Sequence, residues 1–275
     1  MRLEHLMAGW EQVAERVRNA RRILVMSDFD GTLTPIAGRP EEATMPERTK
    51  ELLQALVQQP RVVIGIISGR ALDDLRSKVD VEGVTYAGNH GLEIEGPEVV
   101  FVNPSAEMAR STVQRLHRDL SRALAGIEGV VIEDKGLTLS VHYRLVDAEK
   151  TDHVKSVFDE IVSGMSATDR IRTTAGKKVL EVRPDVDWDK GKAISLLLDR
   201  QVDAEGEGEV LPVFLGDDVT DVDGFSAVEE RGGISVFVGD EVENSVARYF
   251  LRSPAEVEQF LRQLLDLIEA GDGDA

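Results

Sequence analysis

Two acidic segments of this 275-residue sequence each follow a run of apolar residues, and their side chains could perform chemistry together. Residues 28–32 (DFDGT) follow the apolar run 23–26, and residues 216–221 (GDDVTD) follow the run 211–215. Such continuous runs are typical of strands that are covered on both faces in a parallel sheet. Ligands bind beyond the carboxyl ends of these strands. We therefore expect both acidic segments to lie at one edge of a sheet.

Carboxylates gathered in one place repel one another, so they normally indicate a bound cation. An all-oxygen set of ligands in a chain without cysteine favours a hard ion, and we expect Mg²⁺ rather than Zn²⁺. A calcium-binding EF-hand loop is excluded, because its two possible registers would put Met26 or Val219 at the first ligand position. The candidate metal-binding residues are Asp28, Asp30, Asp217, Asp218 and Asp221.

These residue types fit phosphoryl transfer through an aspartyl-phosphate. Asp28, the first residue beyond its strand, can attack phosphorus. Asp30 can protonate the departing alkoxide and then deprotonate the water that cleaves the acyl-phosphate. The hydroxyl of Ser68 and the charge of Lys190 can each hold a phosphoryl oxygen. We expect Asp217 to give the ion a side-chain oxygen. Asp218 and Asp221 are expected in or just outside the coordination sphere.

Short apolar runs alternate with helical patterns at both ends of the chain, which indicates βαβ units. The expected strands of this kind cover residues 23–26, 62–67, 84–87, 211–215 and 234–238. The alternation predicts a doubly wound, Rossmann-like α/β core. An amphipathic helix is expected over residues 3–17, because their apolar side chains recur at spacings of three and four.

The middle of the chain follows a different order. A helical pattern precedes two β-type runs, and this arrangement occurs twice. The helical patterns cover 106–124 and 154–162, and the β-type runs cover 130–133, 137–143, 170–174 and 178–182. The order predicts an antiparallel sheet with helices on one face, which is an α+β insert. We therefore expect a core formed by residues 1–106 and 184–275, interrupted by an inserted domain over residues 107–183.

The composition limits the partners of such a protein. Lysine and arginine number 32 against 51 aspartate and glutamate residues, which gives a net charge of −19. Such a surface repels nucleic acid and anionic membranes, so we expect neither as a partner. The first residues include several acids, which argues against a signal peptide, and no apolar stretch approaches the length of a membrane span. We expect a cytoplasmic monomer that acts on a small molecule.

Four segments, in order along the chain, resemble the signature motifs of the haloacid dehalogenase-like (HAD) phosphatases: DFDGTLTPI, SGR, DKG and GDDVTD. More narrowly, GNHGLEI, VHYR, GKKVLEVRPDVDWDKGKA and GDDVTDVDGF resemble the trehalose-6-phosphate phosphatases, and the likeness runs from about residue 23 to residue 265. The resemblance implies Mg²⁺-dependent hydrolysis of trehalose 6-phosphate, a sugar phosphate, to trehalose and phosphate. It also implies a HAD core with an α/β cap domain inserted after the third core strand.

The resemblance also implies roles for individual residues. It makes Asp28 the nucleophile, Asp30 the acid and base, and Ser68 and Lys190 the phosphate binders. The implied ligands of Mg²⁺ are Asp28, the main-chain carbonyl of Asp30, and Asp217. The implied sugar-binding residues are Arg70, Asn89, His90 and Gly91 in the core and His142, Arg144, Lys177 and Glu181 in the cap. The sequence departs from the family pattern at Val222, where glutamate is usual, and at Gly224, where alanine is usual.

Two alternative functions use the same residues. The cap could select another phosphorylated sugar, such as a sucrose, glucosylglycerol or mannosylglycerate phosphate. A non-catalytic sensor could instead hold phospho-aspartate as a regulatory mark. A lasting phospho-aspartate requires loss of the acid and base, whereas Asp30 is present. The sequence therefore favours an enzyme.

Overall fold

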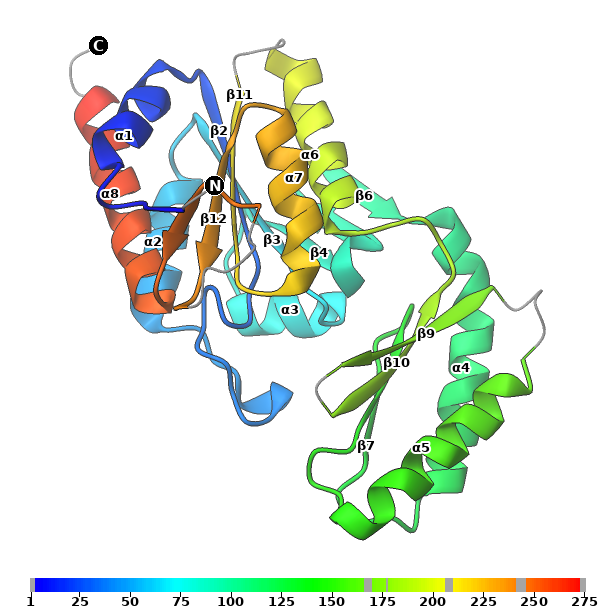
Figure 1. The fold of residues 1–275 in the computed structure, drawn as a ribbon. Coiled ribbons are helices and arrows are strands. Elements are labelled where there is room, and N and C mark those ends of the chain that lie inside the picture. The colour runs from blue at the N-terminus through cyan, green and yellow to red at the C-terminus, as the bar shows by residue number, and fades with distance from the viewer. Residues whose placement is uncertain (1–2, 166–169, 177, 206–209, 241–245, 273–275) are drawn as a thin grey trace. The chain divides into compact units, whose positions relative to one another are not determined.

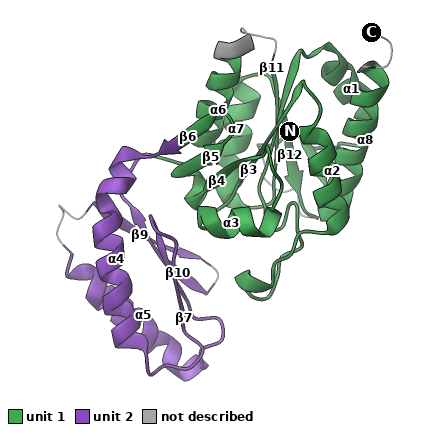
Figure 2. Ribbon diagram, turned by 180° about the vertical axis from the view of Figure 1, so that it is seen from behind, with its two compact units in different colours: residues 1–100, 188–275 green, residues 101–187 purple. Residues whose placement is uncertain are grey.

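The structure is a computed structural model, and it describes residues 3–165, 170–176, 178–205, 210–240 and 246–272. The chain forms two compact units, which Figure 2 distinguishes by colour. Unit 1 consists of residues 1–100 and 188–275, and unit 2 consists of residues 101–187. Unit 2 is thus inserted into the sequence of unit 1.

A nine-stranded sheet forms the centre of unit 1. Neighbouring strands from β1 to β4 pair in parallel, whereas β5 pairs antiparallel with β4. In spatial order the strands are β1 (Glu4–His5), β13 (Tyr249–Leu251), β12 (Ile234–Val238), β11 (Val210–Gly216), β2 (Arg22–Ser27), β3 (Val62–Ile67), β4 (Thr85–Gly88), β5 (Glu93–Gly96) and β6 (Val99–Val102). The chain proceeds outward from β2 on one side and from β11 on the other, so the strand order reverses between these two strands. Ligands of such sheets bind at the reversal.

Helices cover both faces of this sheet (Figure 1). On one face, α1 (Trp10–Asn19), α2 (Glu47–Val57) and α8 (Pro254–Asp272) pack against alternate strand residues, among them Ile23, Val25 and Ile64. The other face carries α6 (Lys190–Glu205) and α7 (Val222–Glu230), while α3 (Leu72–Val79) connects β3 to β4. Burial on both faces explains the continuous apolar sequences of β2 and β3. Among the described residues, no helix has the length and apolar character needed to cross a membrane.

Unit 2 contains a four-stranded antiparallel sheet covered by two helices. The strands are β7 (Val131–Asp134), β8 (Leu139–His142), β10 (Val179–Pro184) and β9 (Ile171–Gly176) in spatial order, and the helices are α4 (Pro104–Leu124) and α5 (Ala148–Ser163). Leu116 of α4, Val154 of α5 and Val141 of β8 belong to one buried core. The predicted fold class, a doubly wound α/β core with an inserted α+β domain, is therefore confirmed.

The N-terminal segment differs from the prediction. The helix expected over 3–17 begins only at Trp10, because residues 4–5 form β1 beside β13. Nε2 of His5 also lies 2.9 Å from Oε2 of Glu256 in α8. Pairing with the sheet edge gives hydrogen-bond partners to these backbone groups, so it outweighs the helical periodicity of the first residues. The strands β5, β6 and β13 were likewise not predicted.

Candidate active site

The carboxyl ends of β2 and β11 meet where the strand order reverses. Asp28 follows β2 and Asp217 follows β11. The amide of Asp28 donates to the carbonyl of Leu215 over 2.8 Å. This bond extends the parallel pairing by one residue and fixes the backbone of Asp28 beside the neighbouring strand. The two acidic segments therefore share one edge of the sheet.

Lys190, the first residue of α6, joins two of the acidic residues. Its Nζ atom donates to Oδ1 of Asp28 and to Oδ1 of Asp221, each over 2.6 Å. Lys190 is 3% exposed, and both aspartates are buried. Burial alone would lower the pKa of the lysine, but the two carboxylates outweigh it and raise this pKa above its usual value. The ammonium group is therefore charged at neutral pH, and it holds Asp28 in one orientation.

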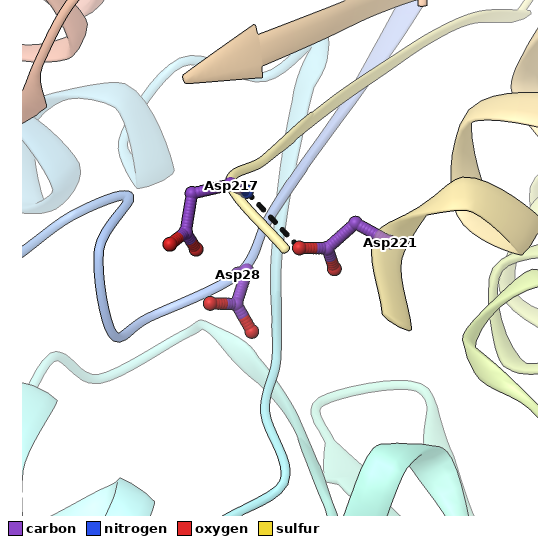
Figure 3. A group of neighbouring side chains, drawn as sticks. All are labelled: Asp28, Asp217 and Asp221. Atoms are coloured by element: carbon purple, nitrogen blue, oxygen red, sulfur yellow. Dashed lines mark hydrogen bonds between the residues drawn. The ribbon is translucent and has the colours of Figure 1, made fainter. Parts of the chain in front are cut away.

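The carboxylate of Asp221 fixes the turn that follows β11 (Figure 3). Its Oδ2 atom accepts hydrogen bonds from the amides of Asp217 and Asp218, both over 3.0 Å. Glycine is required at position 216, because a Cβ atom on Gly216 would lie 2.4 Å from Cγ of Asp221. Asp218 is exposed, and its side chain caps the short helix over 219–221. The carboxylate of Asp221 therefore stabilises the backbone of the GDDVTD turn.

Three carboxylates can direct oxygen atoms to a common point. The candidate ligand atoms of Asp28, Asp217 and Asp221 all lie within 4.8 Å of one another. Burial and the charges of Asp221 and Asp218 together raise the pKa of Asp217 to about 7, against the opposing effects of Lys190 and Thr32. Burial also raises the pKa of Asp28, against the opposing effect of Lys190. A cation would relieve this crowding of negative charge, and the oxygen donors fit Mg²⁺.

The loop after β2 closes around Asp217. The hydroxyl of Thr32 donates to Oδ1 of Asp217 over 3.2 Å. Gly31 has a φ of +86°, and a Cβ atom there would come within 2.1 Å of Oδ2 of Asp217. The glycine of the DFDGT segment therefore permits the close approach of the loop, and the threonine orients the carboxylate.

Asp30 is bound by Arg70. Nε of Arg70 donates to Oδ2 of Asp30 over 2.6 Å, and Nη2 donates to Oδ1 over 2.7 Å. Nη1 donates to Oδ2 of Asp74 over 2.7 Å, and the guanidinium lies 5.4 Å from the centre of the Phe29 ring. Burial lowers the pKa of Arg70, but its bonds to Asp30 and Asp74 raise this pKa overall. Arg70, implied to bind the sugar, thus contacts the implied acid and base directly.

Ser68 and the GNHG segment lie beyond the carboxyl ends of β3 and β4. Oγ of Ser68 accepts from the amide of Arg70 over 3.2 Å, and the carbonyl of Ser68 accepts from the amide of His90 over 2.8 Å. Asn89 and His90 have left-handed φ angles of 50° and 58°, and Gly91 follows at 86°. Non-glycine residues persist in this region where the surrounding structure constrains them, often at functional sites. These residues therefore join the edge of the sheet that holds Asp28.

His142 and Glu181, two of the implied sugar-binding residues, lie on the same face of the sheet in unit 2. Nε2 of His142 lies 3.0 Å from Oε2 of Glu133, and Oε1 of Glu181 lies 3.6 Å from Nζ of Lys135. Glu133 and Glu181 are both paired with Ser140, one from each neighbouring strand. Sequence analysis did not select Glu133 or Lys135. Residues 131–134 are Val-Ile-Glu-Asp, which do not alternate between apolar and charged types, so no periodic signal in the sequence marks Glu133.

The remaining positions singled out from the sequence are distributed as follows. Arg144 is exposed after β8, and Lys177 lies outside the described residues. Val222, where the family usually has glutamate, begins α7. A Cβ atom on Gly224 would lie 2.4 Å from Cε1 of Phe214. Glycine at this position therefore lets α7 pack closely on β11.

Comparisons with known proteins point to one family. A family model described as trehalose-phosphatase matches residues 26–255. Probable trehalose-phosphate phosphatase 3 of Oryza sativa subsp. japonica is 33% identical, over 97% of this chain and 75% of that protein. Trehalose 6-phosphate phosphatase RA3 of Zea mays is also 33% identical, over 89% of this chain and 70% of that protein.

Solved structures share the fold. The C-terminal domain of C. albicans trehalose-6-phosphate phosphatase has a TM-score of 0.77 at 24% identity, over 96% of this chain and 98% of that chain. Aspergillus fumigatus trehalose-6-phosphate phosphatase has a TM-score of 0.64 at 27% identity, over 96% of this chain and 99% of that chain. A haloacid dehalogenase-like hydrolase from Bacteroides thetaiotaomicron has the same fold at 18% identity, with a TM-score of 0.60. The chain therefore belongs to the trehalose-phosphatase family, as its motifs predicted.

Proposed function

We propose that this protein hydrolyses trehalose 6-phosphate to trehalose and phosphate, with Mg²⁺ as cofactor and a phosphorylated Asp28 as intermediate. Family membership supports the substrate. One observation supports the mechanism: the buried ammonium group of Lys190 lies 2.6 Å from both Asp28 and Asp221, at the reversal point of the sheet. This arrangement fixes the carboxyl group of Asp28 beside a positive charge, at the edge of the sheet where ligands bind.

In the first step, a carboxylate oxygen of Asp28 attacks phosphorus, and the bond from phosphorus to the sugar oxygen breaks. Asp30, in its protonated form, gives its proton to the departing sugar oxygen. Lys190 stabilises Asp28 as a carboxylate, because its charge opposes the effect of burial on the pKa of Asp28. We assign phosphoryl binding to the hydroxyl of Ser68 and to the ammonium group of Lys190.

In the second step, Asp30 as a carboxylate takes a proton from water, and the water oxygen attacks phosphorus. The acyl-phosphate bond breaks, Asp28 returns to its carboxylate form and phosphate leaves. The two hydrogen bonds from Arg70 support this step, because they fix the direction of the Asp30 carboxylate. Arg70 thus positions Asp30 in the proposed reaction.

We propose that Asp28, Asp217 and the main-chain carbonyl of Asp30 hold Mg²⁺, with Asp218 and Asp221 beside them. The buried carboxylates and the raised pKa values of Asp28 and Asp217 support a cation here. When bound, Mg²⁺ supplies positive charge that offsets the negative phosphoryl oxygens. Asp221 contributes by holding the amides of its neighbours.

We propose sugar-binding roles for two groups of polar residues. Arg70, Asn89, His90 and Gly91 form the group in unit 1, and His142, Arg144, Lys177 and Glu181 form the group in unit 2. The left-handed backbone at Asn89 and His90 supports a role for the first group. The placement of Glu181 and His142 on the helix-free face of the unit 2 sheet supports a role for the second.

We further propose that the enzyme works in the cytoplasm as a monomer. The sequence has no cysteine and a net charge of −19, which suits a reducing compartment and discourages self-association. Light scattering after gel filtration should give a mass near 30.2 kDa. A mass of twice that value or more would contradict the monomer.

Phosphate release from a panel of sugar phosphates tests the function. The panel contains trehalose 6-phosphate and the phosphates of sucrose, glucosylglycerol and mannosylglycerate, each assayed with Mg²⁺ and with a chelator. We expect the highest kcat/KM for trehalose 6-phosphate, and loss of turnover with the chelator. A higher kcat/KM for another member would change the assigned substrate, and full activity with the chelator would contradict the metal site.

A further inference from the structure

Unit 1 has a cavity of about 220 Å³ at the opposite end of the sheet from Asp28. Arg22 begins β2, and Val62 begins β3, and both line this cavity. Leu197, in the middle of α6, and Gln201, in the second half of this helix, line it as well. The cavity therefore lies at the amino ends of the strands, whereas the proposed catalytic residues lie beyond the carboxyl ends.

Gly65, in the middle of β3, is one of the residues that line the cavity. Gly65 is paired with Met26 of β2 and Thr85 of β4, so these three residues face the same side of the sheet. A Cβ atom on Gly65 would lie 3.3 Å from Cγ of Met26 and 3.9 Å from Cδ1 of Leu197. Gly65 therefore lies between Met26 of the sheet and Leu197 of α6, with room for little more than a hydrogen atom as its side chain.

Part of the cavity lining is apolar. Leu24, Val63, Val99 and Leu197 belong to its lining and come from β2, β3, β6 and α6. Aliphatic side chains from four elements form a surface that can bury an apolar ring or chain. An apolar body is therefore the first requirement for an occupant.

Polar and charged residues also line the cavity, namely Gln201, Glu98, Arg22 and Arg200. Gln201 is 6% exposed, and its Nε2 atom donates to Oε2 of Glu98 over 3.2 Å. Its amide oxygen accepts no hydrogen bond from any residue that the structure describes. A buried acceptor in this state is stabilised by any donor that reaches it. Arg22 and Arg200 add two guanidinium groups, which favour a carboxylate or phosphate.

We propose that this cavity is a second ligand site of the protein. Its ligand is a small molecule with an apolar ring or chain, an anionic group and a hydrogen-bond donor. The apolar body packs on Leu197 and the other aliphatic lining residues, and the anion lies beside the arginines. The site is independent of the proposed hydrolysis. It contacts β2, β3 and α6, whose other ends carry Asp28, Ser68 and Lys190.

Indole-3-acetate is a suitable probe, because it combines an aromatic ring, a carboxylate and an N–H donor. Indole-3-acetamide has the same shape without the charge. Methyl-labelled full-length protein is titrated with each compound and followed by NMR. We expect saturable shifts of the methyl groups of Leu24, Val63, Val99 and Leu197, with a Kd below about 1 mM for the acetate. The acetamide should bind about tenfold more weakly, because the charge-assisted bonds are lost.

Matched variants test the location of the site. Val63→Phe places a ring in the cavity and should abolish the shifts, whereas Val100→Phe, at a position 78% exposed on β6, should preserve them. Arg200→Gln, a surface change that spares the core, should reduce acetate affinity to that of the acetamide, whereas Arg262→Gln on α8 should not. Thermal melting confirms that each variant is folded.

Three results would overturn the proposal. These are an acetate Kd above about 1 mM, equal affinities for the two probes, and shifts that persist in Val63→Phe. The first result would mean that the cavity does not bind a ligand of the proposed class. Arg200→Gln keeps the test decisive if Val63→Phe fails to fold.

Discussion

Arg70 and Asp30 are joined by two parallel hydrogen bonds of 2.6 Å and 2.7 Å, although the aspartate side chain is 37% exposed. The buried guanidinium also binds Asp74 and the carbonyl of Pro40, so its own position is fixed. A fixed guanidinium gives an otherwise mobile carboxylate a single direction. This relationship links the SGR and DFDGT segments and fixes the direction of the Asp30 carboxylate.

Replacing Arg70 by lysine keeps the charge but removes the paired hydrogen bonds. We expect Arg70→Lys to lower kcat by about 10–100-fold on both trehalose 6-phosphate and 4-nitrophenyl phosphate, because misplacement of Asp30 affects both reactions. Arg76→Lys is the matched control, since Arg76 forms an exposed ion pair with Glu95. Steady-state kinetics measures the effect. A loss confined to trehalose 6-phosphate would instead place Arg70 among the groups that only bind the sugar.

Asp30→Asn separates the two steps of the proposed reaction. 4-Nitrophenolate is a good leaving group that needs little protonation, so the first step should proceed, whereas the second step lacks its base. We expect a burst of about one nitrophenolate per active site, followed by turnover at least about 100-fold slower than that of the parent protein. Stopped-flow absorbance measures both phases. Unchanged steady-state turnover would remove Asp30 from the reaction.

Lys190→Met leaves Asp28 and Asp221 buried without their shared cation. We expect a loss of about 3–5 kcal/mol in the free energy of unfolding, because an uncompensated buried charge is costly. Added Mg²⁺ should restore part of this loss by supplying positive charge at the same carboxylates. Lys192→Met, at a half-exposed position on the same helix, is the control and should change stability by less than about 0.5 kcal/mol. Equal melting curves for the two variants would show that the Lys190 contacts contribute no stability.

Glu181→Ala tests recognition of the sugar. Glu181 lies on the helix-free face of the sheet in unit 2, between Lys135 and Arg183. We expect KM for trehalose 6-phosphate to rise by about tenfold or more, because hydrogen bonds to a charged acceptor are lost, while kcat/KM for 4-nitrophenyl phosphate stays unchanged. Glu160→Ala on α5 serves as the control in the same unit. Equal losses on both substrates would place Glu181 outside the sugar site.

The positions of the main chemical groups could be predicted because each follows a buried strand. Asp28, Ser68 and Asp217 come directly after β2, β3 and β11, and parallel strands bring their carboxyl ends to one edge. The insertion was also visible, because the order of helical and β-type patterns changes in the middle of the chain. These features depend on local periodicity, which a sequence shows directly.

Other features depend on contacts that periodicity does not encode. Arg70 and Asp30 are 40 residues apart, and nothing in either segment specifies which carboxylate the guanidinium meets. The short strand β1 lies in a segment with helical spacing, and only β13 at the far end of the chain gives it a partner. The cavity near Gly65 likewise results from the register of three strands against α6.

The most direct test of the account is the chemical identity of the intermediate. The Asp30→Asn variant is mixed with 4-nitrophenyl phosphate and Mg²⁺ and quenched in acid within the burst phase. The protein is then digested and analysed by mass spectrometry. We expect one phosphoryl group on the peptide that contains Asp28, carried by Asp28 itself, and none when Asp28→Asn is added to the variant. Phosphate release without any phosphorylated peptide, or a phosphoryl group on a different residue, would contradict covalent catalysis by Asp28.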